Sequence, residues 1–213
     1  ATRAEALQML HDHRDGDAKI LAGGQSLVPM MIFRMAQPET LIDINRLDEL
    51  AFVEDRGATI AIGALTRHND VMGHPLVVRH LPLVAAAYAN VAHHTIRNRG
   101  TIGRNVVHAD AADFFLGVFT TDVEPHELLR EIEIAKPPSG TGCAFEEVSL
   151  RTGDFAMASV AAEIRVEAGR IAAARIAIGG IAGAPFRAGV AEARLVGCEP
   201  AASAVAEIAA TQI

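Results

Sequence analysis

The stretch Ile20-Leu21-Ala22-Gly23-Gly24-Gln25-Ser26-Leu27-Val28-Pro29 decides how this chain is organised. It is typical of a short apolar strand, a double-glycine turn and the start of a helix. Glycine lets the backbone adopt positive φ and lets a ligand approach the main chain closely. A helix that begins just after such a turn directs free N–H groups at its ligand. The pattern is suited to an anion site, such as one for phosphate, with Ser26 as the N-cap. Taken alone, the stretch favours a plain strand–turn–helix connection, and two later stretches shift the balance toward the anion site.

Outward from this stretch, apolar periodicity predicts short helices and strands. Thr2-Arg3-Ala4-Glu5 fits a capping box and predicts a helix to about His13. Thr66 is expected to cap a helix that runs through Met72. The other expected elements of the first half are strands at 19–22 and 41–44, a helix from Leu27 to about Met35, a hairpin of 51–54 with 59–62, and a buried helix at 83–91.

The second half begins after a candidate linker or hairpin loop at Lys136–Gly142. Beyond it, two strands at 160–167 and 171–178 are expected to pair around Ala168-Gly169. Alanine-rich helices are expected at 188–195 and 201–210. Hairpins mixed with helices, without regular βαβ alternation, predict an α+β fold.

The composition excludes several classes of function. The 213 residues carry 19 Lys and Arg against 26 Asp and Glu, a net charge of −7, which argues against a general nucleic-acid binder. No apolar run approaches the roughly 20 residues of a membrane helix, so we expect no membrane span and a cytoplasmic location. The two cysteines and nine histidines form no spacing typical of a metal or iron–sulfur site.

A second glycine loop, Arg97–Asn105, contains Gly100 and Gly103. The Rossmann and P-loop glycine motifs are absent, so any dinucleotide must be held in another way. The two glycine loops together are suited to clamp a pyrophosphate through backbone N–H groups. Arg97 and Arg99 are either a solvated part of the loop or anion contacts, and solvation is the favoured interpretation.

Several motifs in combination resemble one family. These are Ala22–Pro29 with Leu41-Ile42-Asp43-Ile44, Arg99–Gly103 with His108-Ala109-Asp110, Phe114–Thr121, Gly153–Ala156, and Gly179–Pro185. The chain resembles the FAD-binding medium subunit of molybdenum hydroxylases, the relatives of carbon monoxide dehydrogenase and xanthine dehydrogenase. The resemblance covers nearly the whole chain.

The resemblance implies a two-lobed α+β FAD-binding domain of the PCMH type over residues 1–135, with the lobes split near 50–55. A smaller α+β domain would follow over 142–213, incomplete at its end. The residues implied to hold FAD are Ala22, Gly23, Gly24, Gln25, Ser26, Leu27, Thr101, Ile102, Gly103, Asn105 and Asp110.

The implied function is electron transfer. A large partner subunit would carry molybdopterin, a small one would carry [2Fe–2S] clusters, and this chain's FAD would pass electrons to an external acceptor, in a dimer of heterotrimers. Because the cofactor carries the redox chemistry, no catalytic side chain is expected. The alternatives are a flavin-free scaffold or assembly subunit and, more weakly supported, a self-contained flavin oxidase.

The chain departs from the family at two internal places. Arg104 stands where the family usually has a second glycine, and we expect its side chain to turn outward. A sizeable family segment is missing between Asp110 and Ala111. A true deletion there would favour the flavin-free scaffold.

Overall fold

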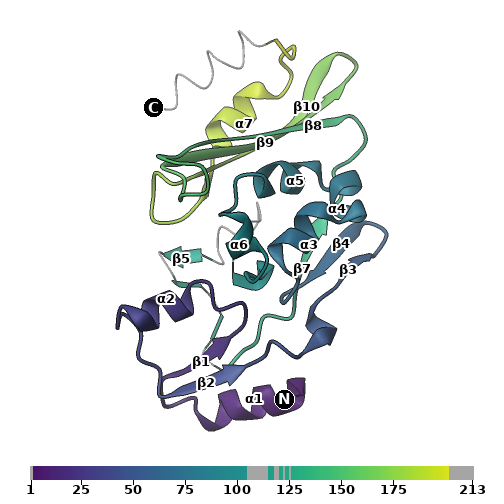
Figure 1. Ribbon diagram of the computed structural model, residues 1–213. Helices are drawn as coiled ribbons and strands as arrows, with labels where there is room; N and C mark the ends of the chain where they lie inside the picture. Colours follow the sequence, from purple (N-terminus) through teal and green to yellow (C-terminus); the bar gives the residue numbers. More distant parts are fainter. Residues whose placement is uncertain (1, 105–114, 118–119, 122, 125, 202–213) are drawn as a thin grey trace. The chain divides into compact units, whose positions relative to one another are not determined.

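The computed structural model describes residues 2–104, 115–117, 120–121, 123–124 and 126–201 (Figure 1). Its mixture of helices and sheets confirms the predicted α+β class. Close contacts divide the chain into two units, which we describe separately. Unit 1 comprises Ala1–Val77, His93–Val106 and Asp122–Ala135, and unit 2 comprises Val78–Ala92, Val107–Thr121 and Lys136–Ile213.

Unit 1 begins with a helix packed on a small parallel sheet. The helix α1 (Arg3–Asp12) starts with the predicted capping box, since the Thr2 side chain accepts from the Glu5 N–H at 3.2 Å and Glu5 accepts from the Thr2 N–H at 2.7 Å. Strands β1 (Ala18–Leu21) and β2 (Thr40–Asp43) run parallel, with Ala18 opposite Thr40. The helix α2 (Leu27–Ile32) follows the glycine turn and ends before Met35.

The core of this region joins residues from distant parts of unit 1. Its buried members are Ala6, Leu10, Ile42, Ile44, Leu47, Leu50 and Leu65, and Ile20 and Ala22 pack against it. Ala22 is the residue that leads into the glycine turn. The packing of the core therefore fixes where that turn begins.

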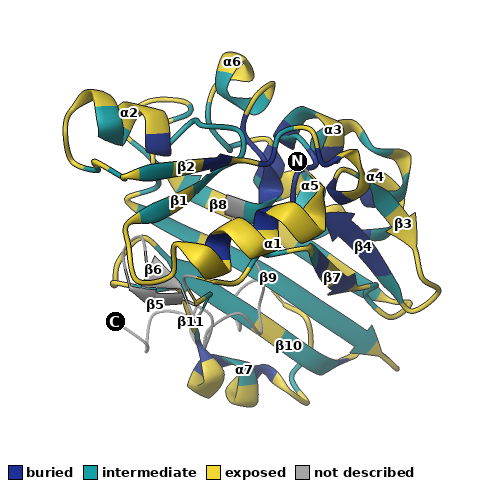
Figure 2. Ribbon diagram, turned by 90° about the horizontal axis from the view of Figure 1, so that it is seen from below, coloured by how far each residue is buried: buried dark blue, intermediate teal, exposed yellow. Residues whose placement is uncertain are grey.

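A second sheet in unit 1 is antiparallel, in the order β3 (Val53–Asp55), β4 (Thr59–Gly63) and β7 (Glu131–Ala135). The β3–β4 hairpin was predicted, whereas β7 was not. Strand β4 is buried along most of its length, as the dark blue ribbon shows in Figure 2. It is the central strand of this sheet.

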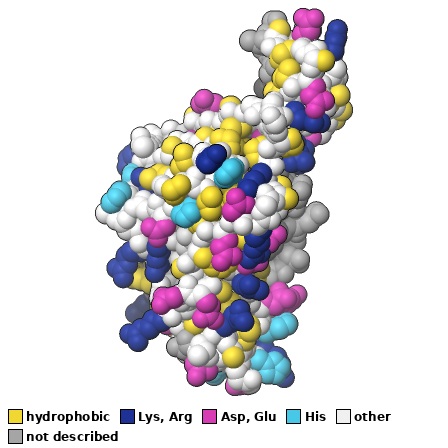
Figure 3. All heavy atoms as spheres, turned by 90° about the vertical axis from the view of Figure 1, so that its right-hand side faces the viewer, with side chains coloured by type: hydrophobic (Ala, Val, Ile, Leu, Met, Phe, Trp, Pro, Cys, Tyr) yellow, Lys and Arg dark blue, Asp and Glu magenta, His cyan; other side chains and the backbone are white. Residues whose placement is uncertain are grey.

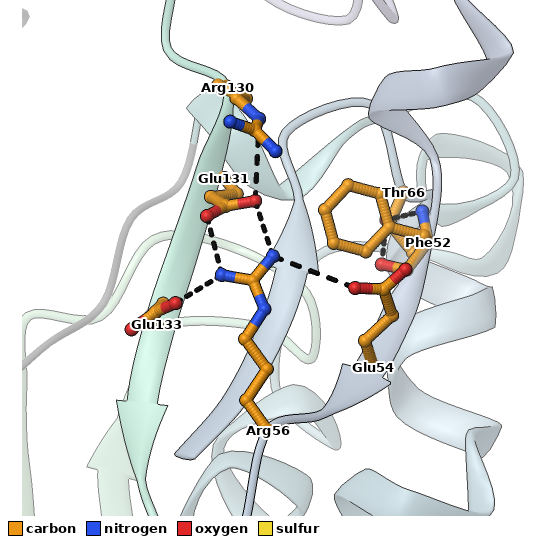
Figure 4. A network of polar contacts seen from close by, with 7 residues as sticks. All are labelled: Phe52, Glu54, Arg56, Thr66, Arg130, Glu131 and Glu133. Carbon is orange, nitrogen blue, oxygen red and sulfur yellow. Dashed lines mark hydrogen bonds and ion pairs between the residues drawn. The ribbon is translucent and has the colours of Figure 1, made fainter.

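An ion-pair network ties β7 to the β3–β4 hairpin (Figure 4). The Arg56 guanidinium pairs with Glu131 at 2.7 Å and also with Glu133, and Glu54 lies 3.6 Å away. Hydrogen bonds from Arg56 hold the pKa of the Glu131 carboxyl below its usual range, and the carboxylates raise the pKa of Arg56. Because these groups are partly exposed, solvent screens much of their attraction.

Thr66 does not cap a helix, contrary to the prediction. Its hydroxyl donates to the Phe52 carbonyl at 2.9 Å and accepts from the Phe52 N–H at 3.1 Å, so it bridges back to the segment before β3 (Figure 4). The helix α3 (His68–Gly73) has Arg67 at its N-cap position and no side-chain cap. The remaining short helices are η1 (Asp48–Leu50), α4 (Pro75–His80), α6 (His94–Arg97) and η2 (Ile102–Arg104).

Unit 2 is built on an antiparallel sheet in the order β11 (Phe186–Arg187), β10 (Arg170–Gly179), β9 (Ala158–Glu167) and β8 (Thr141–Val148). The predicted turn between β9 and β10 is confirmed, with positive φ at Ala168 and Gly169. The helix α7 (Gly189–Leu195) buries Ala191 and Leu195 against the sheet. Strands β5 (Phe115–Gly117) and β6 (Thr120–Thr121) pair with each other.

The helix α5 (Pro82–Tyr88) belongs to unit 2, where it packs against β8 and β9. The prediction of a buried helix is wrong in part, because Tyr88 is its one fully buried residue. The predicted helix at 201–210 lies outside the described residues, apart from Ala201. The domain limits 1–135 and 142–213 stay a prediction.

Candidate functional site: a cavity at two glycine loops

The first glycine loop, Ala22–Leu27, leaves β1 and enters α2. Gly24 has φ +73°, the left-handed conformation that glycine adopts without strain. Its carbonyl accepts from the Val28 N–H at 3.1 Å, and the Gln25 side chain donates to the Gly23 carbonyl at 3.3 Å. No acceptor among the described residues takes the N–H groups of Gly24, Gln25 or Ser26. These N–H groups are therefore free to bind a ligand.

Ser26 occupies the N-cap position of α2, as predicted, but its side chain makes no capping hydrogen bond. Its φ of −119° and ψ of −44° lie in the helical region, whereas a capping residue usually has extended backbone. Leu27 is buried, whereas Ala22 to Ser26 are partly exposed. The loop thus presents backbone, rather than a capped helix end, to solvent.

The second glycine loop packs directly against the first. A Cβ atom placed on Gly23 would lie 2.1 Å from the Arg99 carbonyl oxygen and 2.9 Å from the Gly100 Cα. No side chain fits between the two loops at this point. The structure therefore brings together the two stretches that the sequence singled out, and the close approach itself requires glycine at position 23.

The second loop differs from the prediction in its hydrogen bonding. The Ile102 N–H donates to the Thr66 carbonyl and the Gly103 N–H to the Ala64 carbonyl, each at 3.0 Å. These two amides are therefore not free to bind pyrophosphate. Thr101 and Ile102 are buried, and a Cβ on Gly103 would lie 2.8 Å from Ala64. The described part of this loop is a packed support in which the Ile102 and Gly103 amides already have acceptors, and its contacts to FAD stay a prediction.

A cavity of about 450 Å³ opens beside the first loop. Its charged lining comes from Arg67, Arg99 and Asp43. Hydrogen bonds from the Asn45 backbone and side chain hold the pKa of Asp43 below its usual range, so it stays a carboxylate. The remaining residues of the lining are Leu21, Ala22, Gly23, Gly24, Gln25, Val28, Pro29 and Asn45.

His68 lies beneath the second loop. It is buried, and a Cβ placed on Gly100 would lie 2.7 Å from its imidazole ring. Burial, with a smaller contribution from the Arg97 charge, lowers the pKa of His68 to about 4. His68 is therefore neutral near pH 7 and adds no charge to the cavity.

Two cavity residues, Asn45 and Arg67, were missed by the sequence analysis. Asn45 could have been found, because it follows β2, and parallel strands end at the same sheet edge as the glycine turn after β1. No local sequence signal marks Arg67. Arg99 was considered, with solvation as the favoured interpretation; it is exposed, as that interpretation expects, and it also contributes to the cavity lining. Asn105, Asp110 and the Arg104 side chain lie outside what the structure describes.

The described cavity fits a diphosphate in three respects. It has backbone N–H groups with no acceptor among the described residues, two arginines beside one carboxylate, Asp43, in its lining, and a turn whose glycine adopts positive φ. Such concave backbone sites with nearby cations are typical anion sites. Within the described ranges, no three His, Cys, Asp or Glu side chains gather as a metal site would require.

Charge elsewhere on the surface is mixed. On the face shown in Figure 3, Lys and Arg side chains are interspersed with Asp and Glu. The net charge of −7 forms no one-sign patch on this face. Among the described helices, none has the length and apolar character that crossing a membrane requires.

Known proteins match both parts of the chain. Residues 1–112 match the family described as the FAD binding domain in molybdopterin dehydrogenase, and residues 143–212 match the CO dehydrogenase flavoprotein C-terminal domain. The chain is 38% identical over 209 residues to the carbon monoxide dehydrogenase medium chain of Hydrogenophaga pseudoflava, covering 85% of this chain and 73% of that one. It is 39% identical over 202 residues to subunit alpha of the 6-hydroxypseudooxynicotine dehydrogenase complex of Paenarthrobacter nicotinovorans, covering 81% and 68%.

Solved structures give the same result. Carbon monoxide dehydrogenase from Hydrogenophaga pseudoflava superposes with a TM-score of 0.88 at 37% identity, over 97% of this chain and 83% of that one. Quinoline 2-oxidoreductase from Pseudomonas putida 86 gives a TM-score of 0.91 at 31% identity, over 100% and 83%. The resemblance is thereby confirmed: this chain belongs to the family of FAD-binding medium subunits of molybdenum hydroxylases, and is an oxidoreductase component with an FAD-binding domain followed by a smaller C-terminal domain.

Proposed function

We propose that this chain binds FAD at the two glycine loops and serves as an electron-transfer subunit. Electrons would arrive from [2Fe–2S] clusters on a small partner subunit and leave to an external acceptor. A large partner subunit would hold molybdopterin and choose the substrate, in a dimer of heterotrimers. The relatives' names, medium chain and complex subunit, support an assembly of several chains.

The observation that carries the proposal is the first loop. The N–H groups of Gly24, Gln25 and Ser26 have no acceptor among the described residues, and Gly24 and Gln25 line a cavity whose lining also includes Arg67 and Arg99. Two phosphate groups carry charge that suits planar, permanently charged guanidinium groups. The diphosphate of FAD fits this arrangement.

Bound FAD would supply the redox chemistry, because it accepts and releases electrons. The residues of this chain bind and orient the cofactor. Gln25 holds the Gly23 carbonyl, the second loop supports the first through Arg99, and the cavity arginines offset phosphate charge. No side chain in this account takes or gives a proton. The proposed FAD contacts are those predicted from the sequence, with Ile102 and Gly103 in a supporting role.

The visible spectrum of the chain tests the proposal. We expect the chain, mixed with FAD and freed of excess cofactor, to show bound-flavin absorbance, and its chemically reduced form to be reoxidised by an added acceptor. A preparation that stays colourless after incubation with FAD would refute the proposal. That result would favour the flavin-free scaffold or assembly subunit.

A further inference from the structure

Asn45 connects the end of β2 to the first glycine loop. Its side-chain Nδ2 donates to the Ala22 carbonyl at 2.7 Å and lies 3.3 Å from the Leu21 carbonyl. Its Oδ1 accepts from the Arg67 guanidinium at 3.0 Å. One amide side chain therefore holds the carbonyl that precedes Gly23 and is itself held by an arginine.

Arg67 extends this connection to the second loop. Its other terminal nitrogen, Nη1, donates to the Arg99 carbonyl. That same carbonyl is the group against which Gly23 packs. Hydrogen bonds thus run without interruption from Ala22 through Asn45 and Arg67 to Arg99, joining segments 22 to 32 residues apart.

The connection fixes the orientation of a peptide unit in the first loop. In a planar trans peptide, the carbonyl of one residue points opposite to the N–H of the next. A bond from Asn45 to the Ala22 carbonyl therefore also fixes the direction of the Gly23 N–H. Without it, a glycine turn has several accessible orientations, and a carbonyl rotated toward the cavity would repel a phosphate. The hydrogen bonds of Asn45 to the Ala22 carbonyl and to Arg67 oppose that rotation.

Arg67 keeps its positive charge available in this arrangement. Both of its acceptors, the Asn45 amide oxygen and the Arg99 carbonyl, are neutral. The guanidinium lies in the lining of the 450 Å³ cavity. Lysine at this position would keep the charge but lose the planar fork that reaches two acceptors at once.

We propose that Asn45 and Arg67 are positioning residues for FAD, acting as one clamp that holds the two glycine loops at a fixed separation and a fixed peptide orientation. The proposal rests on the proposed function, because it concerns the affinity of the same cavity. The clamp sets affinity through the Ala22 and Arg99 carbonyls. Asn45 acts on the cofactor through the loops, and Arg67 does so in addition to the charge that it contributes to the cavity.

The test is a double-mutant cycle on the full chain with Asn45→Ala, Arg67→Lys and the double variant. FAD affinity is measured by fluorescence titration, at a temperature where thermal unfolding without FAD shows each variant to be folded. Arg170→Lys is the matched control, since Arg170 donates to the Gly197 carbonyl at 2.7 Å in unit 2. A purely structural role would lower the unfolding temperature without changing the affinity of the folded chain.

We expect each single variant to weaken FAD binding by 10- to 100-fold, and the control by less than twofold. The double variant should bind FAD at most about threefold less tightly than whichever single variant binds it least tightly, because both changes break the same connection. The clamp would be refuted, and FAD binding itself would stand, by either of two results. One is single variants whose FAD affinities lie within twofold of the parent, and the other is a double variant whose loss equals the product of the two single losses. A parent chain that takes up no FAD would refute the proposed function and the clamp with it.

Discussion

Replacing Gly23 with alanine tests the contact on which the site depends. The new Cβ would lie 2.1 Å from the Arg99 carbonyl oxygen and 2.9 Å from both the Arg99 carbonyl carbon and the Gly100 Cα. An ordinary contact begins near 3.4 Å, so the loops must separate by roughly 1.3 Å (3.4 − 2.1). The obstructing atoms are backbone atoms, which cannot move aside as the end of a flexible side chain can.

Forcing a methyl group into a well-packed contact costs about 1–3 kcal/mol. For a chain of this length that corresponds to a decrease in unfolding temperature of roughly 2–12 °C. Separating the loops also stretches the Arg67–Arg99 hydrogen bond and moves the Gly24 N–H. We therefore expect at least a tenfold loss of FAD affinity, or about 1.4 kcal/mol.

The assay is thermal unfolding without FAD, followed by FAD titration of the folded protein. Gly73→Ala is the matched control, because a Cβ at Gly73 meets nothing within 4 Å and its φ is not positive. We expect this control to match or exceed the parent in stability, since alanine favours helix over glycine. If Gly23→Ala retains the stability and the FAD affinity of the parent, the loop contact does not support the site.

Three further perturbations have defined outcomes. Gly24→Val places a branched side chain at φ +73°, where only glycine is unstrained. FAD titration should show loss of binding, while far-ultraviolet circular dichroism should show a retained fold. An unchanged FAD affinity would contradict the role of this turn. The pKa of His68 falls from 6.5 to about 4 on folding, so between these pH values only the unfolded state binds the proton. The free energy of unfolding should therefore decrease by up to about 3 kcal/mol as the pH falls from 6.5 to about 4. Denaturant unfolding of His68→Gln should lack this decrease. Glu131 has a lowered pKa in the folded chain, so its ion pair with Arg56 stabilises the fold above pH 4.5, the ordinary pKa, and this stabilisation is lost as the pH falls below that value. In thermal unfolding, Arg56→Met should therefore lose less stability at acid pH than the parent. An unchanged decrease in unfolding temperature at acid pH would exclude a role for the pair.

The local sequence determined several elements and the family of this protein. The capping box at Thr2 specifies its helix because both partners lie within four residues. The hairpin over 53–63 and the turn at Ala168-Gly169 follow from alternation and turn residues, which are also local. The glycine loops were identified as the candidate cofactor site, and they lie together.

Only the tertiary structure decided how those loops are used. Whether a backbone N–H is free depends on acceptors far away in the chain, and the Ile102 and Gly103 amides are paired with Thr66 and Ala64, 36 and 39 residues earlier (102 − 66 and 103 − 64). The same holds for Arg67, which has no recognisable motif and gains its role from Asn45 and the Arg99 carbonyl. Periodicity and turn chemistry report short-range preferences, whereas hydrogen-bond partners across the fold are set by packing, and that physical difference separates what the sequence determines from what it leaves to the fold.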